Sequence, residues 1–393
     1  NLIIKIDGTN DIPVVSHISS KTVDEGGNKV TGQITATDLD HGDTATFATN
    51  YQHAGFVLHA DGSYTLDPTD PSFNHLAVGE HETLIIPVTA TDNNGAQSAP
   101  QNLIIKIDGT NDIPVVSHIS SKTVDEGSAK ISGQITATDL DHGDTATFTT
   151  TYQHAGFILN QDGSYTLDPT DPSFNHLAMG EHQTLIIPVT ATDNNGAQSA
   201  PQNLIIKIDG TNDIPVVGHI SSKTIDEGGN KVTGQIAATD LDHGDTATFA
   251  TSYQHAGFVL NPDGSYTLDP TDPSFNHLAV GEHETLIIPV TATDNNGAQS
   301  APQNLIIKID GTNDIPVVSH ISSKTVDEGG NKVTGQITAT DLDHGDTATF
   351  ATNYQHAGFA LNPDGSYTLD PTDPSFNHLA VGEHETLIIP VTA

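Results

Sequence analysis

The chain has 393 residues and is strongly acidic, with 50 aspartate and glutamate residues against 12 basic ones and a formal net charge of −38. Nucleic-acid binders need basic surfaces, and anionic membrane surfaces attract basic segments, so this charge excludes both classes of partner. The absence of cysteine excludes thiolate metal sites and cysteine nucleophiles. No apolar run reaches the length of a membrane-spanning helix, so this segment is not expected to insert into a membrane.

In chain order, the first predicted elements are short extended pieces around Val14-Val15 and Thr22-Val23, followed by strands over 28–38 and 44–51. The run 55–67 predicts a hairpin around Asp61-Gly62, since this dipeptide accepts positive φ. The insert 67–79 is bounded by prolines and is compatible with a single helical turn. Alternating apolar residues then predict strands over 83–92 and 102–108. About seven strands separated by turn signals indicate an all-β, seven-stranded immunoglobulin-like β-sandwich.

The sequence repeats with a period of 101 residues, since "IDGTNDIPVV" at 6–15 returns at 107–116, 208–217 and 309–318. A period of this length is a whole small domain and not a solenoid unit, so the prediction is a tandem array. Residues 1–7 are expected to be the last strand of a preceding repeat. Complete repeats are expected at 8–108, 109–209 and 210–310, and a repeat lacking its last strand at 311–393.

Acidic residues gather near strand ends in four motifs of each repeat: "VDEGG", "ATDLDHGD", "TATDNNG" and "IDGTND". Hard cations such as Ca²⁺ take several oxygen ligands from carboxylates, asparagine side chains and backbone carbonyls. Each motif alone is typical of turns. Together they indicate a cation site, because clustered carboxylates repel one another without one. At the first complete junction six carboxylates and Asn111 are expected to converge: Glu25, Asp108, Asp112, Asp139, Asp141 and Asp193.

The candidate calcium ligands are the corresponding positions of all repeats. In sequence order they are Asp7, Asn10, Asp11, Glu25, Asp38, Asp40, Asp92, Asp108, Asn111, Asp112, Glu126, Asp139, Asp141, Asp193, Asp209, Asn212, Asp213, Glu227, Asp240, Asp242, Asp294, Asp310, Asn313, Asp314, Asp341 and Asp343.

The stretch "TVDEGGNKVTGQITATDLDHGDTATF", followed by "VTATDNNGAQ" and "LIIKIDGTNDIPVV", resembles a cadherin-type repeat. It is more similar still to the VCBS repeats of large type I-secreted (RTX-type) bacterial adhesins, through "DGSYTL", "GEHETLIIPVTATDNNGA" and "GTNDIP". The resemblance implies cadherin-like sandwiches with calcium at their junctions. It also implies a stalk on the bacterial cell surface that projects a distal binding domain for attachment or biofilm formation. The Asp-Arg-Glu motif of cadherins is missing, and Asp67 or Asp70 are the candidates to replace it.

Other chemistries are less well supported. The recurring histidines form no tight pair, so a zinc site is not expected; in the first repeat they are His17, His41, His53, His75 and His81. Ser63 or Ser72 with a histidine and an aspartate could be drawn as a triad, but no Gly-x-Ser-x-Gly elbow occurs, so no enzyme is expected. The serious alternative is a calcium-dependent module that binds a glycan or itself. An aromatic content of 5% without tryptophan weighs against glycans.

The two ends of the chain suggest a partner. Residues 1–6 repeat the letters of 102–107, the predicted final strand of a repeat. We expect Leu2 and Ile4 to lie away from the core of the 8–108 repeat. They could then fill the incomplete fourth repeat of another copy by donor-strand addition, head to tail. The predicted partners are thus the neighbouring repeats and a second copy of the chain.

Overall fold

The computed structural model describes residues 2–393, so residue 1 of the predicted strand 1–7 lies outside the described residues. It divides into two compact units, Asn1–Thr211 and Asn212–Ala393. Each unit contains two of the sequence repeats. The boundaries predicted from the 101-residue period remain a prediction.

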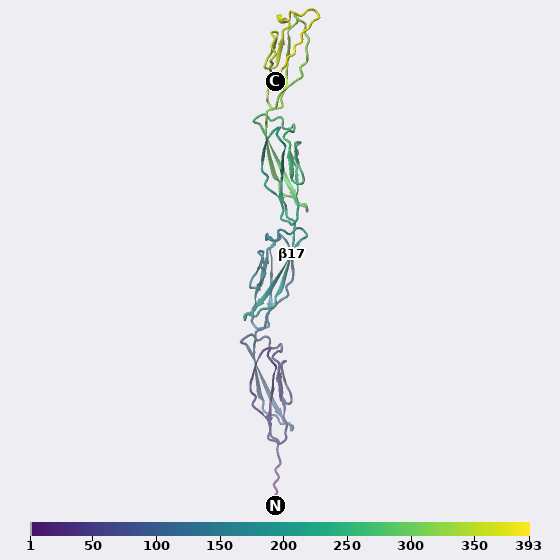
Figure 1. Ribbon diagram of the computed structural model, residues 1–393. Coiled ribbons are helices and arrows are strands. Elements are labelled where there is room, and N and C mark those ends of the chain that lie inside the picture. Colours follow the sequence, from purple (N-terminus) through teal and green to yellow (C-terminus); the bar gives the residue numbers. More distant parts are fainter. Residues whose placement is uncertain (1) are drawn as a thin grey trace. The chain divides into compact units, whose positions relative to one another are not determined.

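The first repeat is built from nine strands, and its strands run side by side in the ribbon of Figure 1. They are β1 (Val14–Val15), β2 (Lys21–Asp24), β3 (Val30–Gln33), β4 (Ala36–Thr37), β5 (Thr46–Ala48), β6 (Phe56–Leu58), β7 (Ser63–Leu66), β8 (His81–Thr91) and β9 (Gln101–Asp108). The predicted strand 28–38 is divided into β3 and β4, and 44–51 is shortened to β5. The predicted hairpin is formed by β6 and β7, with Gly62 at a φ of 84°.

Two larger sheets form the sandwich. One has the order β2-β9-β8-β5 and the other β3-β7-β6, while β1 pairs with β4 in a short ribbon. The two larger sheets hold seven strands between them, as the sequence predicted. In the first sheet β9 is central: it lies antiparallel to β8, from His81↔Asp108 to Val88↔Gln101, and parallel to β2.

Apolar residues that alternate along β8 and β9 form the core of the first repeat. Leu84, Ile86 and Val88 of β8 and the alternate apolar positions of β9 are at most 1% exposed. They pack against Tyr64 and Leu66 of β7, which face them from the second sheet. Because the pleat sends successive side chains to opposite faces, an alternating strand buries one face only. The alternation seen in the sequence is therefore confirmed.

The second and third repeats repeat this plan, and β17 of the second is labelled in Figure 1. The second repeat contains β10 (Val115–Val116), β11 (Lys122–Asp125), β12 (Ile131–Gln134), β13 (Ala137–Thr138), β14 (Thr147–Thr150), β15 (Phe157–Leu159), β16 (Ser164–Leu167), β17 (His182–Thr192) and β18 (Gln202–Asp209). The third contains β19 (Val216–Val217), β20 (Lys223–Asp226), β21 (Val232–Gln235), β22 (Ala238–Thr239), β23 (Thr248–Thr251), β24 (Phe258–Leu260), β25 (Ser265–Leu268), β26 (His283–Thr293) and β27 (Gln303–Asp310).

The fourth repeat is less regular. Its strands are β28 (Val317–Val318), β29 (Val333–Gln336), β30 (Ala339–Thr340), β31 (Phe359–Leu361) and β32 (Ser366–Leu369), and a 3-10 helix η1 (Pro374–Phe376) lies in the proline-bounded insert. The fourth repeat contains the three-stranded sheet β29-β32-β31, but its described residues form no four-stranded sheet. No helix with the length and apolar character of a membrane span occurs within residues 2–393.

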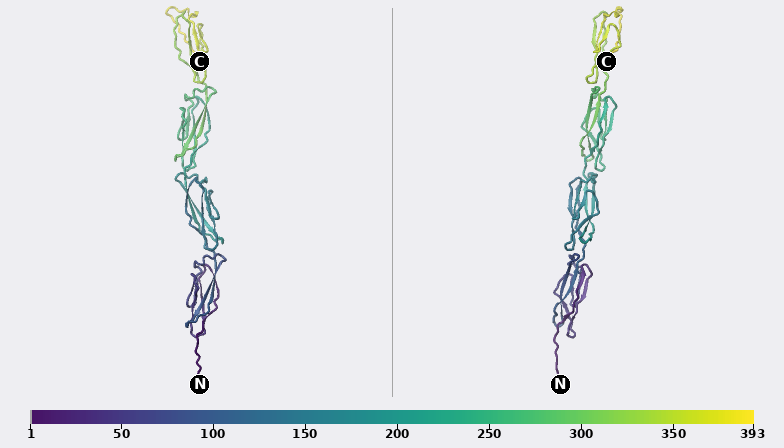
Figure 2. Two further views of the ribbon diagram at one scale, coloured as in Figure 1. Left: turned by 180° about the vertical axis from the view of Figure 1, so that it is seen from behind. Right: turned by 90° about the vertical axis from the view of Figure 1, so that its left-hand side faces the viewer.

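The N-terminal segment forms no strand between residues 2 and 13. Figure 2 shows from two further sides that this purple segment leads away from the strands of the first repeat. Leu2 is 88% exposed and Ile4 is 73% exposed. These side chains do not pack into the first core, as the sequence predicted.

Candidate metal centre

The candidate centre of the first unit lies at the linker that follows β9. Gly109 begins this linker, and its backbone N–H donates to the carbonyl of Glu80 at 3.0 Å. A Cβ at Gly109 would lie 2.2 Å from the carbonyl oxygen of Leu76, so only glycine fits here. This close approach anchors the linker to the first repeat and sets the start of the acidic stretch that follows.

Linker residues Asn111 and Asp112 are tied to the second repeat. The Asn111 side chain donates to Asp193 Oδ2 at 2.8 Å, and the backbone N–H of Asp112 donates to Asp141 Oδ2 at 2.8 Å. The backbone N–H of Asp141 in turn donates to Asp139 Oδ1 at 3.0 Å. Two strand ends and the linker therefore bring four carboxylates together.

Glu25 is the contribution of the first repeat to this cluster. It follows β2 and is only 6% exposed. Burial raises the pKa of Glu25 from 4.5 to about 7. A backbone hydrogen bond from Thr110 opposes this rise, and the charges of Asp112 and Asp141 add to it. Burial likewise raises the pKa values of Asp112 and Asp141, and nearby carboxylates add to the effect. A group of buried carboxylates without cationic neighbours is costly to keep ionised.

The oxygens left without partners give the chemical character of the centre. At this junction five buried side-chain oxygens accept no hydrogen bond: Glu25 Oε2, Asn111 Oδ1, Asp112 Oδ2, Asp139 Oδ2 and Asp141 Oδ1. Buried polar atoms are nearly always satisfied in native proteins, so five in one place call for a ligand. Carboxylate and amide oxygens are the donors that Ca²⁺ prefers, and the set fits that ion.

The candidate calcium ligands predicted from the sequence omit one aspartate of each repeat. Asp144 offers an oxygen within 4.8 Å of oxygens from Asp139 and Asp193, and the side chain of Asn194 donates to it at 3.2 Å. The equivalent trio in the first repeat is Asp38, Asp43 and Asp92, and in the third it is Asp240, Asp245 and Asp294. In the fourth repeat the trio is Asp341, Asp343 and Asp346, in which Asp343 corresponds to Asp141. The sequence contained the information needed to include Asp43, because Asp43 ends the "ATDLDHGD" motif that also contains Asp38.

Asp193 has a different role from the unsatisfied carboxylates. Burial raises its pKa, but hydrogen bonds from Asn111 and from backbone N–H groups, among them that of Ala197, outweigh this effect and lower it. Its Oδ1 accepts the Ala197 N–H at 2.9 Å. Asp193 is therefore held ionised by the turn that follows β17, and it orients Asn111 at the same time.

The aspartates at the ends of β9, β18 and β27 form ion pairs with lysines. Asp108 forms an ion pair with Lys106, Asp209 with Lys207, and Asp310 with Lys308. Lysine and aspartate two residues apart lie on the same face of a strand. Near the N-terminus, outside any strand, Asp7 forms an ion pair with Lys5 at 2.6 Å. The structure thus gives these four predicted ligands a lysine partner.

The second unit repeats the centre where the third repeat meets the fourth. The backbone N–H of Asp314 donates to Asp343 Oδ2 at 2.8 Å. Burial, followed by the charge of Asp314, raises the pKa of Glu227. Buried oxygens without a hydrogen-bond partner recur here on Glu227, Asp314 and Asp343. Of the remaining predicted ligands in this unit, Asn313 donates to the carbonyl of Asp314 and Asp341 accepts from the backbone of Asp343.

The first and third repeats carry the same linker contacts at their N-terminal ends. In the first, Asn10 donates to Asp92, the backbone of Asp11 to Asp40, and the backbone of Asp40 to Asp38. In the third, Asn212 donates to Asp294, the backbone of Asp213 to Asp242, and the backbone of Asp242 to Asp240. Glu126, the equivalent of Glu25 in the second repeat, is 6% exposed, and its backbone N–H donates to the carbonyl of Asp209 at 2.8 Å.

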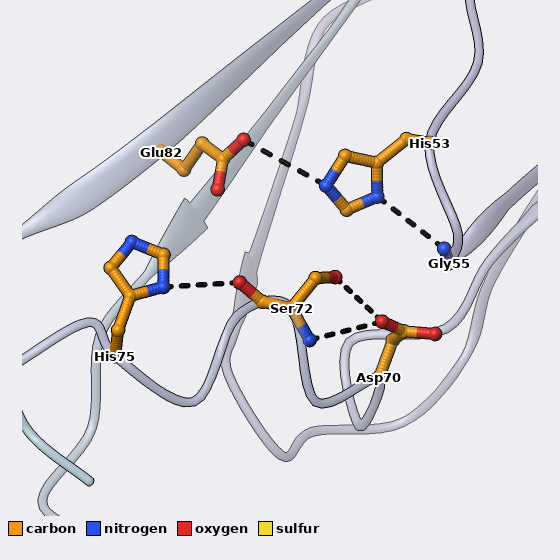
Figure 3. A network of polar contacts seen from close by, with 6 residues as sticks. All are labelled: His53, Gly55, Asp70, Ser72, His75 and Glu82. Carbon is orange, nitrogen blue, oxygen red and sulfur yellow. Dashed lines mark hydrogen bonds and ion pairs between the residues drawn. The ribbon is translucent and has the colours of Figure 1, made fainter.

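Asp67 and Asp70 of the proline-bounded insert have hydrogen-bond partners within their own repeat. Asp67 forms an ion pair with Lys29 at 3.0 Å and accepts from Thr69. The Asp70 carboxylate accepts from the hydroxyl and backbone of Ser72 (Figure 3). These hydrogen bonds lower the pKa values of both carboxyls and hold the turns of the insert. That either residue replaces the missing cadherin motif stays a prediction.

Figure 3 also shows the polar contacts of Ser72, which lies in this insert, and of His53, which precedes it in the sequence. The hydroxyl of Ser72 donates to Asp70, while Nδ1 of His53 accepts the backbone N–H of Gly55 at 3.3 Å. Accepting at Nδ1 places the proton of a neutral imidazole on Nε2, which faces Glu82 at 3.9 Å. That nitrogen has no free lone pair with which to take a proton from a serine, so the network is structural.

Comparison with known proteins concerns the fold of the repeats. Residues 111–206 match the family model described as a bacterial Ig domain. The second repeat is thus similar to bacterial Ig domains over residues 111–206. This Ig-like repeat occurs four times in the chain with few substitutions. No curated protein matches the chain.

Solved structures with a similar fold include cadherin ectodomains. Protocadherin Gamma B2 extracellular cadherin domains 1–5 match with a TM-score of 0.50 and 18% identity, covering 92% of this chain and 74% of that one. The Protocadherin GammaB4 extracellular domain matches at 0.45 and 17%, covering 93% and 62%, so the chain spans under two thirds of that protein. Drosophila N-cadherin EC1-4 matches at 0.32 and 17%, covering 92% and 93%. The Ig-like repeats of this chain are thus tandem, cadherin-like β-sandwiches.

Proposed function

We propose that the chain is the calcium-rigidified extender of a bacterial cell-surface adhesin, of the VCBS-containing, type I-secreted kind. Tandem Ig-like and cadherin-like repeats fit an extracellular adhesion or extender role. The extender would hold a distal binding domain away from the cell for surface attachment or biofilm formation.

The observation that carries this proposal is the set of five unsatisfied oxygens at the junction of the first two repeats. Glu25 comes from one repeat, and the other four oxygens come from the linker and the next repeat. A divalent cation bound by this set would join the two repeats and restrain the linker between them. The formal charge of −38 supports the same conclusion, because bound cations offset the repulsion within so acidic a chain.

The expected affinity fits an extracellular site. Calcium-binding modules outside the cell commonly have dissociation constants of roughly 10⁻⁴–10⁻³ M. Such a site would fill in an external medium and stay empty at cytosolic calcium concentrations. The repeats would therefore become rigid only after export.

The test is the calcium content of the purified chain, measured by equilibrium dialysis in millimolar calcium. We expect Asp141→Asn to lower the number of bound ions, because it removes charge and ligand capacity from one junction. Asp61→Asn is the matched control: Asp61 is exposed, and its carboxylate accepts from the backbone and hydroxyl of Ser63 in a hairpin turn. A wild-type chain that binds no calcium at millimolar concentration would exclude the proposal.

We further propose that copies of the chain associate with one another. Near the N-terminus Leu2, Ile3, Ile4 and Ile6 are all more than two thirds exposed. Apolar side chains gathered on one short segment favour a contact with another surface. Sedimentation velocity over a range of concentrations tests this second part directly.

A further inference from the structure

The second repeat contains a polar cavity with a volume of about 200 Å³. One water molecule occupies roughly 30 Å³ in the liquid, so the cavity has room for a small organic molecule. His118 and Lys122 line the cavity from the segment that leads into β11, Gln134 lines it from β12, and Tyr165 lines it from β16. An equivalent cavity in the fourth repeat is lined by residues at the same positions. The cavity is therefore a feature of the repeat and not of a single loop.

Tyr165 reaches this cavity because a glycine lies opposite it in the sheet. Gly133 of β12 is the partner of Tyr165 in the antiparallel pair of β12 and β16. A Cβ at Gly133 would lie 2.4 Å from the hydroxyl oxygen of Tyr165, so only glycine leaves room for this side chain. The ring packs against Phe157, with 6.1 Å between the ring centroids, and Tyr165 is only 3% exposed. The ring thus belongs to the core, while the hydroxyl lies over a glycine that also lines the cavity.

The hydroxyl of Tyr165 has no hydrogen-bond partner among the described residues of the chain. Burial raises the pKa of Tyr165, so the hydroxyl keeps its proton and remains a donor. Buried tyrosine hydroxyls usually have a hydrogen-bond partner in native proteins. A buried donor that lies at a cavity without such a partner is a candidate contact for a ligand.

Lys122 brings a positive charge to the same cavity. The other two lysines of the second repeat, Lys130 and Lys207, form ion pairs with Asp168 and Asp209. Within residues 2–393 Lys122 forms no such pair. None of the residues that line the cavity is an aspartate or a glutamate, although the chain contains 50 of them. A free ammonium group and a hydroxyl donor in a cavity without carboxylates favour an anionic ligand.

The donors and the hydroxyl groups of the cavity indicate the class of anion. One ammonium group and one hydroxyl match the single charge and the two oxygens of a carboxylate, whereas a phosphate dianion would need further cationic or N–H donors. Ser117, Ser120 and Thr136 also line the cavity, and their hydroxyls donate to or accept from hydroxyls of a ligand. A carboxylate that also carries hydroxyl groups therefore fits this lining better than a simple one.

We propose that the cavity binds a small hydroxylated carboxylate such as an acidic monosaccharide, with the carboxylate at Lys122 and Tyr165. A ligand of this size in a single small cavity binds with a dissociation constant of about 1 mM or weaker. The inference goes beyond the proposed extender, because it gives the repeat a ligand of its own. It is also independent of calcium, since none of the cavity residues is a candidate calcium ligand.

The first experiment follows the tyrosine ring signals of the whole 393-residue chain by NMR while glucuronate is added at constant free calcium and ionic strength. The signal of Tyr165, identified by its loss in Tyr165→Phe, is expected to shift and to saturate. Acetate, which has only the carboxylate, should bind more weakly, and glucose, which has no charge, should cause no shift. The absence of a shift with glucuronate, or an equal response to glucose, would overturn the site. Equal affinity for acetate would overturn the hydroxylated class of ligand.

A second experiment tests the role of the lysine. Lys122→Met removes the charge but keeps a long side chain at an exposed position, and it should weaken the glucuronate response of Tyr165 by about tenfold or more. Tyr367, in the equivalent cavity of the fourth repeat, should still respond and shows that the chain is folded. Lys130→Met is the matched control and should leave the response of Tyr165 unchanged. A wild-type response of Tyr165 in Lys122→Met, or an equal loss in Lys130→Met, would overturn the proposed site.

Discussion

The replacement Glu25→Gln tests whether the junction between the first two Ig-like repeats is built for a cation. Burial raises the pKa of Glu25 from 4.5 to about 7 in the ion-free chain. A carboxyl with a raised folded-state pKa favours folding at low pH, where it is protonated in both states. As the pH rises from 4.5 to about 7, the unfolded chain loses its proton first and the folded junction is destabilised. Above pH 7 the ionised Glu25 lowers the free energy of unfolding of the junction by about 3 kcal/mol.

Glutamine cannot ionise, so Glu25→Gln removes this cost. At pH 8 in chelator we expect the variant to be more stable at the junction than the wild type, by up to about 3 kcal/mol. At pH 4 in chelator the two should be equal. In millimolar calcium the order should reverse, because the variant has lost a charged ligand. This change of sign distinguishes a cation site from an ordinary buried carboxylate.

The assay is hydrogen exchange followed by mass spectrometry, normalised to the intrinsic exchange rate at each pH. The backbone N–H of Glu25 donates to the carbonyl of Asp108 at 2.8 Å and that of Gly26 to Pro68 at 2.9 Å, so both amides report local opening. In chelator at pH 8 they should exchange up to about 100-fold more slowly in Glu25→Gln.

Glu82→Gln is the matched control, because the equivalent position of the second repeat is naturally Gln183. This control should leave the two amides unchanged with and without calcium. Equal protection of wild type and Glu25→Gln in chelator at pH 8 would refute the reasoning.

Three further predictions concern the same junctions. Calcium at 100 times its dissociation constant should stabilise the chain by about 2.7 kcal/mol per site, and melting curves that coincide in calcium and chelator would contradict this. Chelation should also change the maximum dimension of the chain measured by X-ray scattering. The double replacement Asp139→Ala with Asp141→Ala should loosen the first complete junction even in calcium. Equal dimensions in all samples would count against a rigidifying ion. Gly109→Ala should destabilise the chain by about 1–3 kcal/mol in thermal unfolding, because its Cβ would meet the carbonyl of Leu76 at 2.2 Å. Gly8→Ala, in the same motif but with no atom within 4 Å, should have no such effect, and equal losses would refute the steric argument.

The sequence by itself determined the repeat and most of each sandwich. Alternation along 83–92 and 102–108 predicts strands that bury one face, because the pleat has a period of two residues. The structure confirms this with Leu84 and Ile105 in the core. The acidic motifs at strand ends also predicted most of the residues that the structure brings to the junction, because a strand end and its turn are local features.

Only the tertiary structure decided which acidic residues join the cluster. Asp144 lies in the turn after one strand, yet it meets Asp139 and Asp193 because β14 and β17 are adjacent in the sheet. Asp108 is equally acidic, but Lys106 on the same strand face pairs with it. The burial of Glu25 depends on the linker and the next repeat, which local sequence cannot show.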